Sequence, residues 1–148
     1  MPEQNYTLLL AQVESILSSE SDQIANAANI ATLIYHNVER INWAGFYFER
    51  NGELVLGPFA GQLACTRITI GEGVCGTAYA TNETLLIDDV HNFKGHIACD
   101  VASESEVVVP FKTSRLSGVL DIDSPEKGRF GQAEKVLFEA IAKIYAAA

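Results

Sequence analysis

Apolar residues repeat with two different periods along this chain, and the order of these periods leaves few folds open. They recur at helical spacing within the first 40 residues and again over Gln132–Tyr145. From Asn42 to Asp123 they follow the alternation typical of strands, interrupted by glycine-rich segments. Because helices at both chain ends can lie on one face of a sheet, this order predicts an α+β sandwich with an antiparallel sheet and disfavours a doubly wound parallel one.

Apolar stripes define three long helices. The first carries Leu9, Val13 and Ile16, and the second follows the capping candidate Ser21-Asp22. The stripe of the second helix consists of Ile24, Ala28, Ala31, Tyr35 and Val38. The residues expected to point inward from the last helix are Val136, Leu137, Ile141 and Ile144. We expect these stripes to pack against the sheet or to form a dimer seam, without a chemical role.

The strand pattern is clearest at Trp43, Gly45 and Tyr47, which share one face of an expected strand. Asn51-Gly52 then supplies a hairpin turn. Further strands are expected over Glu53–Phe59, Leu85–Asp88, Glu106–Phe111 and Leu116–Asp123. The glycine- and threonine-rich stretch Gly57–Thr84 is expected to add only a short helix around Thr77–Thr81.

Length and charge limit the classes of function. A chain of 148 residues with 48% hydrophobic residues predicts one domain over residues 1–148. The net charge of −9 would repel a polyanion, so nucleic acid is not an expected partner. No apolar run approaches the roughly 20 residues of a membrane span, and the N-terminus has no basic and apolar leader, so we expect a cytoplasmic protein that does not enter membranes.

The cysteines suggest thiol chemistry. Cys65, Cys75 and Cys99 cannot all pair within one chain and form no CxxC unit, which favours free, reactive or transiently oxidised thiols. Cys99 lies in the loop His91–Ser103, where two imidazoles and Lys94 favour its thiolate form. The alternative is that Cys99 is a small buried apolar residue.

A metal site is a further interpretation of the same residues. His96 and Cys99 are spaced like two zinc ligands, and Cys65, Cys75 and His91 offer candidates for the remaining positions. Structural zinc sites usually contain two such closely spaced pairs, and this chain has one. We therefore expect no metal in the functional site.

Acidic residues gather on one predicted strand face. In the run from Val119 to Asp123 the alternation sends Asp121 and Asp123 to the same side, and Glu106 joins them if the faces match. Carboxylates about 4 Å apart repel by roughly 4 kcal/mol at an effective dielectric of 20. If the cluster lines a pocket, a cation such as an α-ammonium group satisfies it, with Trp43 and Tyr47 as an aromatic wall. The alternatives are a solvated sheet face for the acids and ordinary core packing for Trp43.

The motifs together resemble those of the free methionine-(R)-sulfoxide reductases, a family of GAF-domain proteins, over nearly the whole chain. The resemblance rests on the segments LGPF (56–59), GVCGTA (73–78), DVH (89–91), GHIACD (95–100), SEVVVP (105–110) and GVLDIDSP (118–125). Two departures are Lys94, where the family often has proline, and the altered turn Lys112–Ser117. Neither departure touches a motif side chain.

The resemblance implies a six-stranded antiparallel sheet flanked by helices, a homodimer and thioredoxin as reductant. It also implies that Cys99 is the catalytic cysteine, Cys65 the usual resolving cysteine and Cys75 an auxiliary one. The residues that match its substrate pocket are Trp43, Glu106, Asp121 and Asp123.

The mechanism expected from these roles starts with attack of the Cys99 thiolate on the sulfoxide sulfur, while Glu106 or Asp123 donates a proton to the oxygen. Cys99 becomes a sulfenic acid, Cys65 converts it to a disulfide, and thioredoxin reduces that disulfide without a bound cofactor. The alternative is a non-catalytic GAF sensor of oxidants or small ligands, because the same fold hosts regulatory domains.

Overall fold

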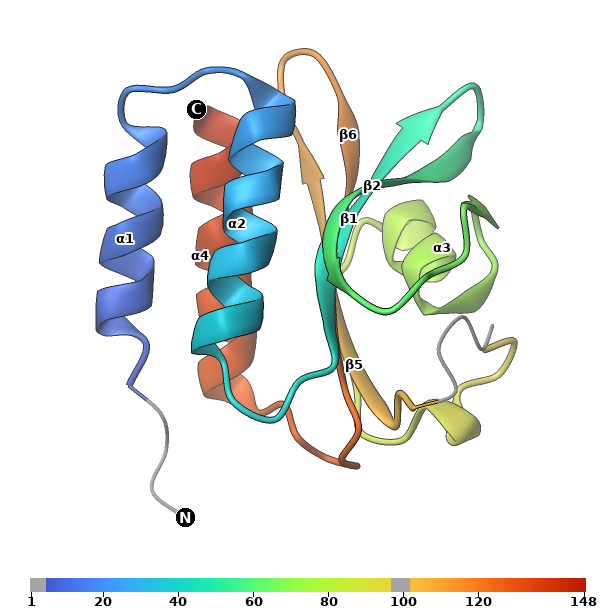
Figure 1. Ribbon diagram of the computed structural model, residues 1–148. Coiled ribbons are helices and arrows are strands. Elements are labelled where there is room, and N and C mark those ends of the chain that lie inside the picture. Colours follow the sequence, from blue (N-terminus) through green and yellow to red (C-terminus); the bar gives the residue numbers. More distant parts are fainter. Residues whose placement is uncertain (1–4, 97–101) are drawn as a thin grey trace.

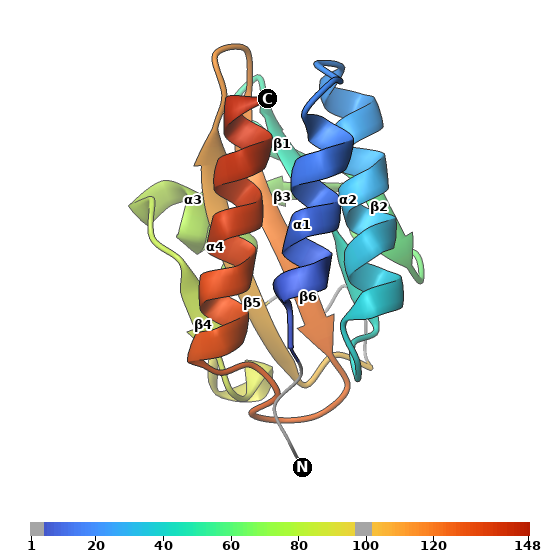
Figure 2. The same cartoon turned by 90° about the vertical axis from the view of Figure 1, so that its left-hand side faces the viewer.

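Three helices cover one face of a sheet, and a fourth helix lies on the other face (Figure 1). The computed structural model describes residues 5–96 and 102–148. The helices are α1 (Thr7–Leu17), α2 (Gln23–Asn37), α3 (Gly73–Thr81) and α4 (Gln132–Ala147), with a short 3-10 turn, η1, at Val90–Asn92. Figure 2 shows α1, α2 and α4 side by side in front of the sheet.

The sheet has six strands in the order β3-β2-β1-β6-β5-β4, and each neighbouring pair is antiparallel. The strands are β1 (Trp43–Arg50), β2 (Glu53–Gly61), β3 (Arg67–Thr69), β4 (Leu85–Ile87), β5 (Ser105–Lys112) and β6 (Ser117–Ser124). Because β1, β6 and β5 are central, one face of these strands is covered by α1, α2 and α4, and the other face lies on the side of α3. The predicted α+β class and antiparallel sheet are confirmed.

The helix-covered face holds the larger apolar core. Phe46 on β1 contacts the ring of Tyr145 on α4, with ring centroids 4.9 Å apart, and Phe111 on β5 joins them. The hydroxyl of Tyr145 donates to the carbonyl of Gln23 at 2.9 Å and so connects α4 to α2. This packing explains why the two chain ends form one layer.

All three predicted helix faces are partly wrong. Val136 is 55% exposed, Ile24 is 51% exposed and Ile16 is 36% exposed, although the stripes that contain them were expected to pack inward. Successive helical residues are about 100° apart, so Val136 cannot share the buried face centred on Leu137 and Ile141. In α2 the buried face is centred on Ile30 and its neighbours. The sheet surface determined which part of a broad apolar stripe became buried.

The hairpin between β1 and β2 follows the prediction. Asn51 and Gly52 have φ values of 53° and 87°, which suit the turn that matches the twist of paired strands.

The segment after β2 has more structure than its composition predicts. β3 is only three residues long and was not predicted, and α3 begins four residues before the expected Thr77. Gly76 allows α3 to approach β3, because a Cβ atom at this position would lie 2.4 Å from the carbonyl oxygen of Thr69. Tertiary packing therefore orders a stretch whose local sequence favours loops.

Among residues 5–96 and 102–148, no helix combines the length and the apolar character that crossing a bilayer requires.

Candidate active site

Three carboxyl groups lie together on the sheet face opposite the core. Glu106 on β5 pairs directly with Asp123 on β6, and Asp121 lies two residues earlier on the same face of β6. Alternation along paired antiparallel strands keeps these side chains on one side. All three are buried, with 7%, 5% and 9% exposure for Glu106, Asp121 and Asp123. The predicted common face of the three acids is therefore present, and it is not a solvated surface.

An aromatic wall borders this cluster. Trp43 on β1 is in register with Asp123, and its ring stacks between those of Phe59 and Tyr47, with centroids 5.3 Å and 6.0 Å away. The Trp43 indole N–H donates to the carbonyl of Gln62 at 3.1 Å. The Tyr47 hydroxyl donates to the carbonyl of Cys65 at 2.8 Å. These bonds hold both rings against the pocket, so Trp43 belongs to a pocket wall as well as to a core.

Gly45, between the two rings on β1, makes the stacking possible. A Cβ atom at this position would lie 2.3 Å from Cβ of Phe59 and 2.7 Å from the Trp43 ring. Gly45 is also in register with Asp121 on β6. The close packing of the aromatic wall therefore depends on this glycine.

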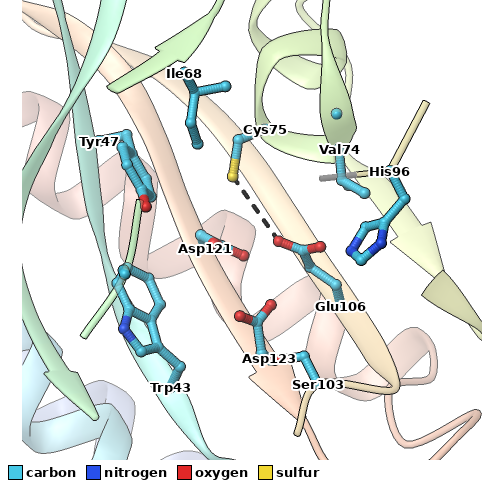
Figure 3. Close-up of a pocket in the computed structure, with 12 residues that line it drawn as sticks. Trp43, Tyr47, Ile68, Val74, Cys75, His96, Ser103, Glu106, Asp121 and Asp123 are labelled. Carbon is cyan, nitrogen blue, oxygen red and sulfur yellow. Dashed lines mark hydrogen bonds between the residues drawn. The ribbon is translucent and has the colours of Figure 1, made fainter. Parts of the chain in front are cut away.

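The first turn of α3 packs over the carboxyl groups and forms the side of the pocket that faces the sheet. Gly73, Val74 and Cys75 line the pocket, and the backbone N–H groups at this helix start receive no side-chain cap. The Cys75 thiol donates to Oε2 of Glu106 at 3.9 Å (Figure 3). The pocket therefore combines buried acids with a buried thiol and a helix N-terminus.

Two carboxylate oxygens of the cluster lack a hydrogen-bond partner among the described residues. Within the described ranges, Oδ1 of Asp121 and Oδ1 of Asp123 are buried and accept no hydrogen bond. Burial raises the pKa of Glu106, Asp121 and Asp123 well above the ordinary range, and the negative charges of neighbouring carboxylates raise each pKa further. The cluster thus favours protonated carboxyl groups or a bound cation.

Cys75 shares this environment. Burial raises the pKa of its thiol well above the usual value, and the charges of Asp121, Glu106 and Asp123 add to the effect. Cys75 is free and 4% exposed. The thiolate form is therefore disfavoured in the unliganded pocket.

The rim of the pocket carries His96 and Ser103. Burial lowers the pKa of His96, with a smaller contribution from His91. Asn42 donates from Nδ2 to Oγ of Ser103 at 3.2 Å, and the Ser103 side chain lowers the pKa of Asp123 against the larger, raising effect of burial. Ser103 therefore favours the ionised form of the one carboxyl group that pairs with Trp43.

Comparison with known proteins assigns the family. The GAF domain family matches residues 25–148. The free methionine-R-sulfoxide reductase of Escherichia coli is 46% identical over 141 residues, covering 94% of this chain and 86% of that protein. The chain belongs to the GAF-domain family of free methionine-(R)-sulfoxide reductases.

Solved structures of this reductase family have the same fold. The structure of fRMsr of Staphylococcus aureus in complex with substrate has a TM-score of 0.92 and 47% identity, covering 99% of this chain and 97% of that one. The free methionine-R-sulfoxide reductase of Neisseria meningitidis, in complex with its substrate, has a TM-score of 0.92 and 39% identity, covering 99% of this chain and 92% of that one. The resemblance inferred from the motifs is confirmed.

The structure gathers most of the residues that sequence patterns and the reductase family indicate. Trp43, Tyr47, Cys75 and the three acids line one pocket (Figure 3). Cys65 is half-buried and packs against the same apolar cluster, but it is not a lining residue. Cys99 lies outside the described residues. His91 points elsewhere, to Asp89 and Glu104, with Nδ1–O distances of 3.0 Å and 3.2 Å.

Sequence reasoning did not find the lining residues Ala64, Ile68, Val74 and Ser103. Ile68 and Val74 look like ordinary core residues, and only the pairing of β3 and the start of α3 bring them to the pocket. In the described part of the chain, none of the residues Cys65, His91 and His96 joins a group with metal-ligand spacing; the one such group is Cys75, Glu106 and Asp121.

Proposed function

We propose that this protein reduces free methionine-(R)-sulfoxide to methionine. The observation that carries the proposal is the pair of unpartnered, buried Oδ1 atoms of Asp121 and Asp123 in front of Trp43. An α-ammonium group supplies the missing charge and hydrogen-bond donors, and the aromatic wall suits the apolar part of a methionine side chain. Relatives named as reductases of this substrate, two of them solved with substrate bound, support the assignment.

The same charges select the free amino acid. A methionine sulfoxide inside a polypeptide has an amide in place of the ammonium group, so its binding would leave buried acids without a cation. Trp43 and Tyr47 restrict the pocket on the side opposite Glu106. We therefore propose that protein-bound sulfoxides are poor substrates.

In the proposed reaction the Cys99 thiolate attacks the sulfoxide sulfur, and the sulfoxide oxygen takes a proton from a carboxyl group, Glu106 or Asp123. The raised pKa of both groups favours the protonated form that can donate this proton. The oxygen then passes as hydroxyl to the Cys99 sulfur, and methionine leaves. The methionine sulfur gains two electrons, which the cysteine sulfur loses.

Regeneration is proposed to use the other cysteines. The thiol of Cys65 condenses with the sulfenic acid of Cys99, releasing water and forming a disulfide, with Cys75 as an auxiliary thiol. The dithiol of thioredoxin reduces that disulfide by exchange and becomes oxidised itself. The cycle needs no bound cofactor. We further propose a homodimer in the cytoplasm, where the reductant is available.

The direct test is thioredoxin-coupled oxidation of NADPH with the separate (R) and (S) epimers of free L-methionine sulfoxide. We expect turnover of the (R) epimer, and its loss in Cys99→Ser. The absence of turnover in folded, fully reduced wild-type protein would reject the reductase assignment in favour of a GAF sensor.

The selectivity is tested with N-acetyl-methionine sulfoxide, which keeps the sulfoxide and lacks the ammonium charge. We expect kcat/KM to fall by at least about 100-fold, the loss expected when buried polar groups are left unpaired. Equal turnover of both compounds would exclude the role given to the acids.

A further inference from the structure

We infer that the carboxylate pocket also binds a divalent transition-metal ion, Zn²⁺ being the best match, through Cys75, Glu106 and Asp121. Such an ion would occupy the place of the substrate ammonium group and act as a competitive inhibitor. The inhibition rests on the proposed function, but the binding does not. This inference departs from the sequence-based expectation that the site takes no metal.

The three side chains have the geometry of a metal site. One ligand atom from each of them, the Sγ atom and two carboxylate oxygens, lies within 4.8 Å of the other two. The Sγ–Oε2 distance between Cys75 and Glu106 is 3.9 Å. Tetrahedral zinc with bonds of about 2.3 Å to sulfur and about 2.0 Å to oxygen requires roughly 3.5 Å between these atoms. Small rotations of the side chains therefore close the site.

The surroundings keep the three ligands in place. Glu106 and Asp121 come from the neighbouring strands β5 and β6, and Cys75 comes from α3, which packs on that face of the sheet (Figure 3). Asp121 is 5% exposed, and its Oδ1 atom has no hydrogen-bond partner among the described residues. This oxygen lies beside a second carboxylate and a thiol, and together the three groups offer a metal ion three of its ligand atoms. Asp123 lies next in line as a further oxygen donor.

The ligand set indicates which cation fits. Carboxylates alone would suit Mg²⁺ or Ca²⁺, but a cysteine sulfur selects softer ions such as Zn²⁺. The ion displaces the thiol proton and supplies the positive charge that the buried acids lack. The substrate offers one positive charge to the same acids, so the two ligands exclude each other.

The test uses a Cys65→Ser/Cys99→Ser variant, in which Cys75 is the one remaining thiol of the three in the chain. Co²⁺ replaces Zn²⁺ as a spectroscopic probe. We expect uptake of one Co²⁺ per chain with a sulfur-to-cobalt charge-transfer band, displacement by Zn²⁺, and loss of the band when L-methionine sulfoxide is added. This variant lacks the proposed catalytic cysteine, so Co²⁺ binding is measured without turnover. The binding result therefore stands even if the wild-type protein shows no reductase activity.

Ligand variants are made in the same background. Cys75→Ser should abolish the charge-transfer band, and Asp121→Asn or Glu106→Gln should each weaken Co²⁺ binding by more than about tenfold. Asp88→Asn, a substitution of an exposed aspartate, is the matched control and should bind as the parent does. Circular dichroism verifies that each variant is folded. No charge-transfer band in the folded parent, or affinity unchanged in both acid variants, would overturn the inference.

Discussion

The two faces of the central strands differ in what they bury. On one face, Phe46 and its neighbours pack against α1, α2 and α4 as an apolar core. On the other face of the same strands lie three buried acids, which α3 covers with its own thiol, Cys75; two of their carboxylate oxygens have no hydrogen-bond partner among the described residues. The first face stabilises the fold, whereas the second carries groups that favour a ligand over the empty state. Such a division is expected when an active site is built on a rigid sheet.

The largest effect should be a loss of activity in variants of the sheet face that carries Glu106, Asp121 and Asp123, here called the acid face. In Glu106→Gln and Asp123→Asn the amide cannot donate the proton that the reaction requires. The variant that lacks the true acid should lose about 10²–10⁴-fold in kcat, while the other should change mainly KM. Steady-state kinetics with free methionine-(R)-sulfoxide measures both. An unchanged kcat in both variants would show that neither carboxyl group donates the proton in the chemical step.

The core face should respond in stability. Phe46 is fully buried, so Phe46→Ala should lower the free energy of unfolding by about 3–5 kcal/mol through lost burial and a cavity. Urea denaturation measures this change. Leu63→Ala, at a position that is 87% exposed, is the control and should stay within about 0.5 kcal/mol of wild type. Similar losses at both positions would contradict the assignment of Phe46 to the core.

Cys75 should be less reactive in the folded protein than in the unfolded chain. In the Cys65→Ser/Cys99→Ser variant, Cys75 should react with iodoacetamide more than about tenfold more slowly than the same chain in urea, because one unit of pKa already changes the thiolate fraction tenfold. Mass spectrometry follows the reaction. Equal rates in folded and unfolded protein would show that burial and the neighbouring carboxyl groups do not suppress the thiolate.

The smallest effect is a gain in stability on the acid face. Burial raises the folded-state pKa of Asp121, so its contribution to stability is fully present below the unfolded pKa and is lost as pH rises toward the folded pKa. Asp121→Asn removes this loss and should stabilise the protein by about 0.5–2 kcal/mol at neutral pH, with less gain near pH 4.

Denaturation curves at several pH values check this gain, with Asp88→Asn as the control on an exposed aspartate. A destabilised Asp121→Asn at neutral pH would mean that the carboxylate is satisfied in the folded protein, and the contrast between the two faces would disappear.

The sequence by itself determined the class of fold and the shared face of Asp121 and Asp123. Alternation in Trp43–Phe48 and in Val119–Asp123 is a local property of strands, so it predicted which side chains lie on each face. Motif resemblance added the sixth strand and the family, both of which are confirmed. Periodicity did not find β3, because its residues lie in a glycine- and threonine-rich stretch typical of loops, whereas the apolar run Leu85–Ile87 marked β4, a strand of the same length.

Only the tertiary structure decided which face became core and which became pocket. Glu106 and Asp123 are 17 residues apart in sequence, and only the register of β5 and β6 makes them direct neighbours. The unpartnered oxygens, the placement of Cys75 over Glu106 and the exposure of Val136 likewise depend on where α3 and α4 pack. Periodicity specifies the direction of a side chain within its own element, but burial and pKa depend on the elements that pack against it.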